Sequence, residues 1–199
     1  MDLRSTARQL GVATRAMLVL TVVLGLGYTA VVTGVGQLVL PGQADGSRVE
    51  HDGTVVGSAL IGQGFLDADG DPLPEWFQPR PSAAGDGWDG AASSGSNLGP
   101  ENDDLVAAVE ERRAAVAELD GVDPASVPVD ALTASGSGLD PHVSPAYARQ
   151  QAARVAEARG LPVAEVERLV DEHVTDRDLG FLGEPRVDVL ELNVALADR

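Results

Sequence analysis

The sequence predicts an α+β fold, in which one N-terminal transmembrane helix is followed by a single soluble α+β domain. Residues 16–40 contain no charged residue and are mostly aliphatic or glycine. The rest of the chain alternates short apolar runs with Asp, Glu, Gly and Pro, as soluble domains do. The 199 residues leave room for one domain of ordinary size. We expect four parts: a cytoplasmic N-terminus at 1–15, a transmembrane helix at 16–40, a tether at 41–53 and the soluble domain at 54–199.

The uncharged segment 16–40 is long enough to cross a bilayer. Its 25 residues would form a helix of about 38 Å at ~1.5 Å per residue, and a bilayer core needs roughly 20 residues. A cleaved signal peptide is the alternative, although its apolar region normally runs about 7–15 residues before a small-x-small cleavage site. Gly42 and Ala44 supply a weak pair of that kind, so this alternative stays open.

The placement of arginines predicts the orientation of this helix. Arg4, Arg8 and Arg15 precede it, whereas the first basic residue after it is Arg48. Basic residues stay preferentially on the cytoplasmic side of a membrane. We therefore expect a single-pass protein of the plasma membrane, with its N-terminus in the cytoplasm and its soluble domain outside.

Small residues repeat every four positions along the same segment. Gly25, Thr29 and Thr33 form one row, and Ala30 and Gly34 form another. Such rows let a second helix approach closely, so Gly25, Thr29 and Thr33 are predicted to contact a partner subunit. The alternative is that these residues have no special role, because glycine is common in membrane helices generally.

The composition excludes several classes of function. With 14 basic and 31 acidic residues, the net charge of −17 repels nucleic acid and anionic lipid headgroups. The chain has no cysteine, which excludes disulfides and thiolate metal sites. Every basic residue is an arginine, and the lack of lysine excludes a Walker A phosphate loop and Schiff-base chemistry.

The first half of the soluble domain carries few periodic signals. Residues 41–53 are polar and rich in Gly and Asp, which indicates a tether, and Thr54–Leu60 is typical of a short strand. From 67 to 100 the chain is rich in Gly, Pro, Ser and Asp and shows no periodicity. Loops that long are usually functional, disordered or held against a partner. Trp76 and Trp88 argue against plain disorder here.

Helix signals dominate the second half. The first predicted helix follows a cluster of acidic residues, which favour a helix N-terminus, and Gly121 is a plausible stop. Ser144 is expected to cap the second helix, with Pro145 at its first position and Gly160 after its end. Pro162 opens a third helix, whose apolar residues share one face. The first predicted helix carries the apolar residues of 105–119, the second spans 145–159, and the third carries the apolar residues of 163–170.

The last apolar run, Val187–Leu196, is predicted as a strand. Its alternation slips between Val189 and Leu190. A β-bulge would explain the slip, as would a strand that ends early. With strands at both ends of a helical region, the class α+β is preferred to α/β.

Four segments carry a resemblance to a known family. They read GSALIGQGF at 57–65 with RPS at 80–82, SSGSNLGP at 93–100, TASGSGLDPHVSP at 133–145, and LGFLGEPRVDVLELNVAL at 179–196. In this order, after one membrane helix, they resemble the C subunit of the Kdp potassium-transporting ATPase (KdpC) over nearly the whole chain. Two departures are visible: Ser94 stands where the family usually has a second glycine, and Asp188 where asparagine is common.

The resemblance implies a non-catalytic subunit of a high-affinity, ATP-driven potassium uptake complex, needed for its assembly and activity. Such subunits sit with a channel-like subunit that passes K⁺ and a P-type ATPase subunit that is phosphorylated. They are described as catalytic chaperones that raise the ATP affinity of the pump subunit. This chain has no DKTGT-type phosphorylation motif, so we expect no cofactor of its own, only ATP shared with the pump subunit. The predicted topology, however, places the soluble domain outside the cell, where ATP is absent.

Four residues of the soluble domain are candidates for a functional role, and each has two interpretations. By resemblance, Gln151 is expected to have a nucleotide-linked role; otherwise it lies on a solvated helix face. Ser96 and Asn97 lie in a Gly/Ser loop that would either cradle an anion through its backbone N–H groups, as nucleotide binding needs, or form a structural turn. Arg80 is predicted to contact a partner by pairing with a carboxylate, or to stack on an aromatic ring.

A membrane-anchored extracytoplasmic hydrolase is the alternative function. Ser135, Asp140 and His142 include the residue types of a catalytic triad, but their closeness in sequence makes the relay geometry hard to form. No metal site is expected. The three histidines are far apart, and the acidic run Asp67–Asp71 lacks the glutamate that completes a calcium loop.

Overall fold

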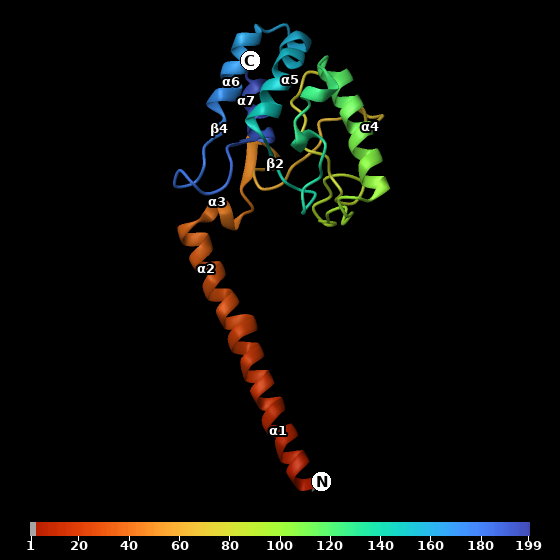
Figure 1. Ribbon diagram of the computed structural model, residues 1–199. Helices are drawn as coiled ribbons and strands as arrows, with labels where there is room; N and C mark the ends of the chain where they lie inside the picture. Colours follow the sequence, from red (N-terminus) through yellow and green to blue (C-terminus); the bar gives the residue numbers. More distant parts are fainter. Residues whose placement is uncertain (1–2) are drawn as a thin grey trace. The chain divides into compact units, whose positions relative to one another are not determined.

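The computed structural model describes residues 3–199 and confirms the α+β class (Figure 1). The chain forms two compact units. The N-terminal unit is Met1–Ser47, and the soluble unit is Arg48–Arg199.

The N-terminal unit is dominated by one long helix, Leu3–Val39. It has 37 residues and is the one helix among residues 3–199 that is long and apolar enough to cross a membrane. At ~1.5 Å per residue it is about 55 Å long, against a hydrocarbon core of about 30 Å. The helix therefore begins well before the predicted span at 16–40 and includes the basic arm. Its parts are α1 (Leu3–Leu20), the π-helical segment η1 (Thr21–Tyr28) and α2 (Thr29–Val39); a short helix, α3 (Pro41–Ala44), follows.

The π-helical segment changes the predicted row of small residues. Gly25 lies in η1, whereas Thr29 and Thr33 lie in α2. A π-helix bonds each residue to the fifth one along, so residues four apart no longer align there as they do in an α-helix. Only the step from Thr29 to Thr33 keeps the spacing on which the prediction rests. That these residues contact a partner stays a prediction.

A two-stranded hairpin opens the soluble unit. Strands β1 (Arg48–His51) and β2 (Thr54–Ser58) pair antiparallel. Asp52 and Gly53 connect them with φ of 50° and 74°, the positive values that a two-residue hairpin turn requires. The predicted strand at 54–60 is present but shorter, and the segment interpreted as a tether, 41–53, contains α3 and the whole of β1.

A second, three-stranded sheet joins distant parts of the chain. Its order is β3-β5-β4, and both pairings are antiparallel. Its central strand is the one next to the last helix. The strands are β3 (His142–Val143), β4 (Val174–Thr175) and β5 (Arg186–Asp188).

The three predicted helices are confirmed, with Gly121, Ser144 and Gly160 at the predicted ends, whereas the cap of the first helix was not predicted. Asn102 caps the first by accepting the N–H groups of Asp104 and Leu105. The Ser144 side chain caps the second, and Gly160 ends it in the left-handed region with φ of 66°. These helices are α4 (Asp103–Asp120), α5 (Pro145–Arg159) and α6 (Val163–Glu172), and the short 3₁₀ turns η2 (Pro124–Ser126) and η3 (Val129–Ala131) connect α4 to α5.

The predicted strand Val187–Leu196 is wrong in most of its length. The strand β5 ends at Asp188, and helix α7 (Val189–Ala197) follows at once. The Asp188 side chain accepts the N–H of Glu191 and so caps the new helix. The slip after Val189 therefore marks a strand that ends early, one of the two explanations considered, and not a bulge.

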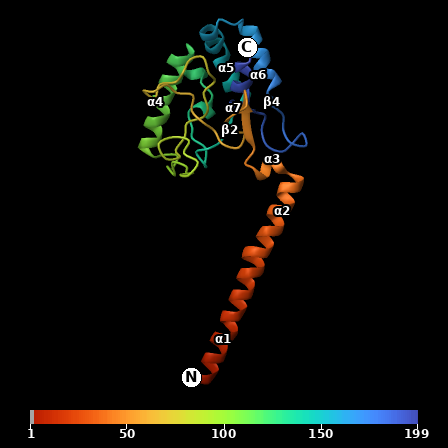
Figure 2. The same ribbon diagram turned by 180° about the vertical axis from the view of Figure 1, so that it is seen from behind.

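The core of the soluble unit lies where α5, α6 and α7 meet β5. Val155, Val170, Val187 and Leu196 are all fully buried there. Helix α4 lies on the other side of the unit from α6, and long loops run between them (Figures 1 and 2). The loop 67–100 contains no helix or strand element, yet Phe77 within it is 1% exposed and joins this core.

Candidate functional site

The segments that carry the family resemblance meet at residues 137–143. This stretch belongs to the third of them, 133–145. Each of the other segments makes a hydrogen bond or a strand pairing with this stretch, although 43 to 77 residues separate the partners. The contacts are Gly62 N to Leu139 O at 2.9 Å, Ser94 N to Ser137 O at 3.0 Å, Ser82 Oγ to Gly138 O at 2.7 Å, and His142 paired with Asp188.

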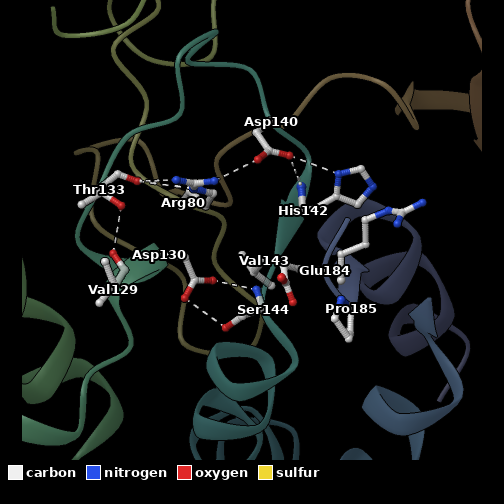
Figure 3. Close-up of a pocket in the computed structure, with 11 residues that line it drawn as sticks. Arg80, Val129, Asp130, Thr133, Asp140, His142, Val143, Ser144, Glu184 and Pro185 are labelled. Carbon is white, nitrogen blue, oxygen red and sulfur yellow. Dashed lines mark hydrogen bonds and ion pairs between the residues drawn. The ribbon is translucent and has the colours of Figure 1, made fainter. Parts of the chain in front are cut away.

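An open pocket of about 520 Å³ lies beside this junction (Figure 3). Its walls come from the loop at Arg80, from η3, from β3 and from the segment that leads into β5. The lining is strongly charged and carries both signs. Its ionisable residues are Arg80, Asp130, Asp140, His142, Glu184 and Arg186.

Arg80 is bound to residues of its own chain. Its Nη1 donates to Asp140 Oδ2 at 3.0 Å, and its Nε and Nη2 donate to the carbonyl of Thr133 at 3.3 and 3.2 Å (Figure 3). Arg159, and not Arg80, stacks on Trp76. Its Cζ lies 4.2 Å from the ring centroid. Arg80 therefore pairs with a carboxylate of the same chain, and its contact with a partner stays a prediction.

Asp140 is the acceptor at the centre of this pocket. Its Oδ1 accepts the backbone N–H of His142 at 3.0 Å and lies 3.1 Å from the Nδ1 of the same residue. These hydrogen bonds, with a smaller contribution from the charge of Arg80, hold the pKa of Asp140 below its usual value despite partial burial. Across the sheet, burial raises the pKa of Asp188. The charged form of Asp140 is thus stabilised where it ties the Arg80 loop to β3.

A second carboxylate fastens the start of α5. Asp130 accepts the backbone N–H of Ser144 at 2.6 Å and its hydroxyl at 3.0 Å (Figure 3). The same hydroxyl oxygen accepts the N–H of Tyr147 at 3.1 Å, which completes the N-cap. Asp130 therefore fixes the position of α5 relative to η3.

The residues of the hypothetical hydrolase triad do not come together. Asp140 and His142 are in contact, but the hydroxyl of Ser135 lies 3.2 Å from that of Ser137 and forms no recorded bond to the imidazole. A nucleophilic serine needs a hydrogen bond to its general base. Among residues 3–199 the Ser135 hydroxyl contacts Ser137 and not His142, so the geometry does not favour the hydrolase alternative.

The Gly/Ser loop with Ser96 and Asn97 packs against the second glycine-rich segment. A Cβ on Gly95 would lie 3.1 Å from the carbonyl oxygen of Gly136, so the two backbones approach closely. Asn97 has φ of 55°, and its side chain donates to Gly95 O at 3.1 Å. This geometry is that of a turn that packs two loops together; anion or nucleotide binding by Ser96 and Asn97 stays a prediction.

Gln151 is completely buried, so its placement on a solvated helix face is wrong. Its Oε1 accepts the N–H of Gln78 and an Nη2–H of Arg154, both at 2.7 Å, and its Nε2 donates to Gln78 O at 3.1 Å. The amide thus pairs with the backbone of an irregular loop much as a strand would. A nucleotide-linked role stays a prediction, and a direct contact would first have to break these bonds.

Asn193 makes the same kind of bond to the neighbouring residue and was not predicted. Its Oδ1 accepts the N–H of Phe77, and its Nδ2 donates to Phe77 O, both at 2.9 Å. Together Gln151 and Asn193 form an amide clamp, one from α5 and one from α7, on the backbone of Phe77 and Gln78. The signal that could have found it is an uncharged polar residue inside the run 189–196, which is otherwise apolar except for Glu191.

The described residues contain no group of three or more His, Asp and Glu that could hold a metal ion. His173 Nδ1 lies 2.8 Å from the carbonyl oxygen of Leu169 in the preceding turn of its helix. In the acidic run, Asp67 Oδ1 accepts the N–H groups of Asp69 and Asp71, both at 2.9 Å. This arrangement is a local turn of the Asx type.

Comparisons with known proteins agree with the resemblance. The family model KdpC, described as K⁺-transporting ATPase, c chain, matches residues 10–198. A potassium-transporting ATPase KdpC subunit of Kineococcus radiotolerans is 60% identical over 194 residues, which cover 98% of this chain and 95% of that protein. Proteins with the same name from Mycobacterium bovis and Beijerinckia indica are 54% and 53% identical, over 95% and 92% of this chain and 97% and 90% of their own. This chain therefore belongs to the KdpC family, the c chain of K⁺-transporting ATPases.

Proposed function

We propose that this chain is a non-catalytic subunit needed for the assembly and activity of a high-affinity potassium uptake complex. The observation that carries the proposal is the family match, which runs from residue 10 in the membrane helix to residue 198 in the soluble unit. The residue types support it as well, because a chain without lysine and without a phosphorylation motif has no means of running an ATPase cycle. ATP hydrolysis then belongs to a partner subunit.

The proposed partners are the channel-like K⁺-binding subunit and the P-type ATPase subunit. The membrane helix would pack against one of them at its small residues Gly25, Thr29 and Thr33, because small residues permit close helix contact. In the soluble unit, Arg80 is the proposed partner residue. Its guanidinium is held by Asp140 and Thr133 but remains at the wall of an open pocket.

The soluble unit is proposed to lie on the extracytoplasmic side. Arg4, Arg8 and Arg15 lie in the N-terminal part of the helix, and basic residues favour the cytoplasm. ATP would then be bound by the pump subunit across the membrane. Any increase in its ATP affinity, the chaperone role that the resemblance implies, would act through the assembled complex and not by direct contact with Gln151, Ser96 or Asn97.

Loss of this chain is expected to abolish the K⁺-stimulated ATPase activity of the complex. The reason is that a subunit with no chemistry of its own acts by holding the catalytic subunits in their working arrangement. The measurement is ATP hydrolysis with and without K⁺ in complexes purified from cells that make or lack the chain. Supplying the wild-type chain from a plasmid should restore the activity. Full K⁺-stimulated turnover by the other subunits alone would contradict the proposed function.

The side of the membrane can be measured with a single thiol. Because the chain has no cysteine, an Ala164→Cys variant carries one reactive group, at an exposed position of α6. It should react with a membrane-impermeant maleimide in intact cells from which any outer barrier has been removed. The matched variant Ser5→Cys, in the basic arm, should react only after lysis. The reverse pattern would place the soluble unit in the cytoplasm and revive direct contact with ATP.

A further inference from the structure

The loop between β4 and β5 exposes a compact group of apolar side chains. Leu179, Phe181 and Leu182 are 82%, 69% and 49% exposed, and we call these three residues the apolar tip. The loop is held in a defined turn, because Asp178 and Leu182 exchange two backbone hydrogen bonds, both of 2.9 Å. Soluble surfaces rarely display large apolar side chains side by side without a binding role.

Two of the three carboxylates near the base of this loop lie beside arginines. Arg177 forms an ion pair with Glu184, and Arg186 lies 3.7 Å from Asp178. Asp176 adds a third carboxylate, so the five ionisable residues within 176–186 carry a net charge of −1, against −17 for the whole chain. This matters because uncompensated carboxylates would be repelled by anionic lipid headgroups.

The loop lies at the end of the soluble unit where the chain enters from the membrane helix. Arg48, the first residue of β1, pairs with Ser58, and the adjacent Gly57 abuts Leu190 at the start of α7. The other end of the hairpin, at His51, lies 3.8 Å from Asp198 beyond the end of α7. Figures 1 and 2 show the start of the soluble unit (orange) and the β4–β5 loop (blue) at the same end of that unit.

The covalent connection limits how far this end can be from a membrane. The apolar helix ends at Val39, and residues 40–47 lead to β1. Eight residues span at most about 28 Å at ~3.5 Å per residue, and the helical turn α3 shortens that reach. The start of β1 therefore lies within about 28 Å of the end of the apolar helix.

We propose that the apolar tip inserts into the lipid interface and gives the soluble unit a second membrane contact. Three exposed side chains are too few for a stable protein interface, which buries about 800 Å² on each partner. They are sufficient for shallow insertion in a chain that a transmembrane helix already anchors, since each buried apolar group adds to the membrane affinity. This inference goes beyond the proposed function and holds for either side of the membrane.

The test uses the assembled complex in vesicles of phosphatidylcholine and phosphatidylglycerol. A Leu179→Cys variant, labelled with a small environment-sensitive fluorophore, reports on the tip. Its fluorescence should be quenched severalfold more strongly by doxyl-labelled phosphatidylcholine than that of a labelled Ala164→Cys control. The control lies next to the connection between α5 and α6, where Arg159 bonds to Leu196 O at the far end of α7. Phe181→Cys, the neighbouring tip position, should repeat the result for Leu179→Cys.

Two other results are possible, and each would overturn the proposal. Quenching by aqueous iodide, at the level of the Ala164→Cys control, would show that the tip remains in water. Protection from both iodide and the doxyl lipid would show that a partner subunit covers it. Neither outcome bears on the K⁺-stimulated ATPase test, so a failure here is distinguishable from a failure of the proposed function.

Discussion

Replacing Arg154 with methionine is expected to lower the free energy of unfolding of the soluble unit by about 3–5 kcal/mol, the usual cost of leaving a buried charge without its partner. The Arg154 and Asp120 side chains are only 6% and 1% exposed, and Arg154 Nε donates to Asp120 Oδ1 at 2.8 Å. After the substitution, Asp120 would keep only the amide of Gln150, at 2.8 Å. The carbonyl of Pro74 would lose its donor as well, and that of Trp76 would keep only the amide of Gln78, at 3.5 Å.

The measurement is a urea titration of the full-length chain in detergent, followed by tryptophan fluorescence. Both tryptophans, Trp76 and Trp88, lie in the soluble unit, so the signal reports on that unit. The matched control is Arg149→Met on the same helix. Arg149 pairs with Asp171, but both side chains are about half exposed, so its loss should cost at most about 1 kcal/mol. Equal losses in the two variants would show that burial of the Arg154 pair is not decisive.

Replacing Asn193 with leucine is expected to destabilise the soluble unit by about 2–6 kcal/mol, because two buried backbone groups each lose a partner at about 1–3 kcal/mol. The side chain is 1% exposed and satisfies both the N–H and the C=O of Phe77. Leucine is similar in size, so the effect should come from the lost hydrogen bonds and not from a cavity.

Hydrogen exchange provides the more specific measurement. In Asn193→Leu the Phe77 amide should exchange faster than in the wild type, even when unfolding is taken into account. Glu191→Leu is the matched control, because it places the same residue on the same helix at an exposed position, with an expected effect within about 0.5 kcal/mol. Unchanged protection of Phe77 would mean that the loop does not depend on the amide clamp.

These two predictions concern the same feature, the anchoring of the long irregular loop 67–100. Backbone groups of a buried segment without helix or strand must find partners in side chains or water. Here Asn193, Gln151 and Arg154 supply them, from α7 and α5. The loop is therefore ordered through its central residues, while its glycine-rich parts carry the turns.

Local sequence signals were sufficient to predict an element where the hydrogen bonds that end it are made within a few residues. Ser144, Gly121 and Gly160 mark helix ends through bonds made within a few residues, and the first two predicted helices follow them. A local signal of the same kind lies after β1, where the sequence Asp52-Gly53 is typical of a hairpin turn. We predicted a tether there and not a strand. The prediction of a strand over 187–196 was wrong because a short apolar run fits a strand and a buried helix equally well.

The sequence by itself determined the long apolar N-terminal helix, the helical second half, the absence of lysine and cysteine chemistry, and the family. Each of these depends on composition or on residues close together in the chain. Only the tertiary structure decided that Arg80 pairs with Asp140, that Gln151 is buried, and that Asn193 holds Phe77, 116 residues away. The physical reason is that a buried polar side chain takes whichever partner the fold brings to it, and no local pattern records which backbone group that will be.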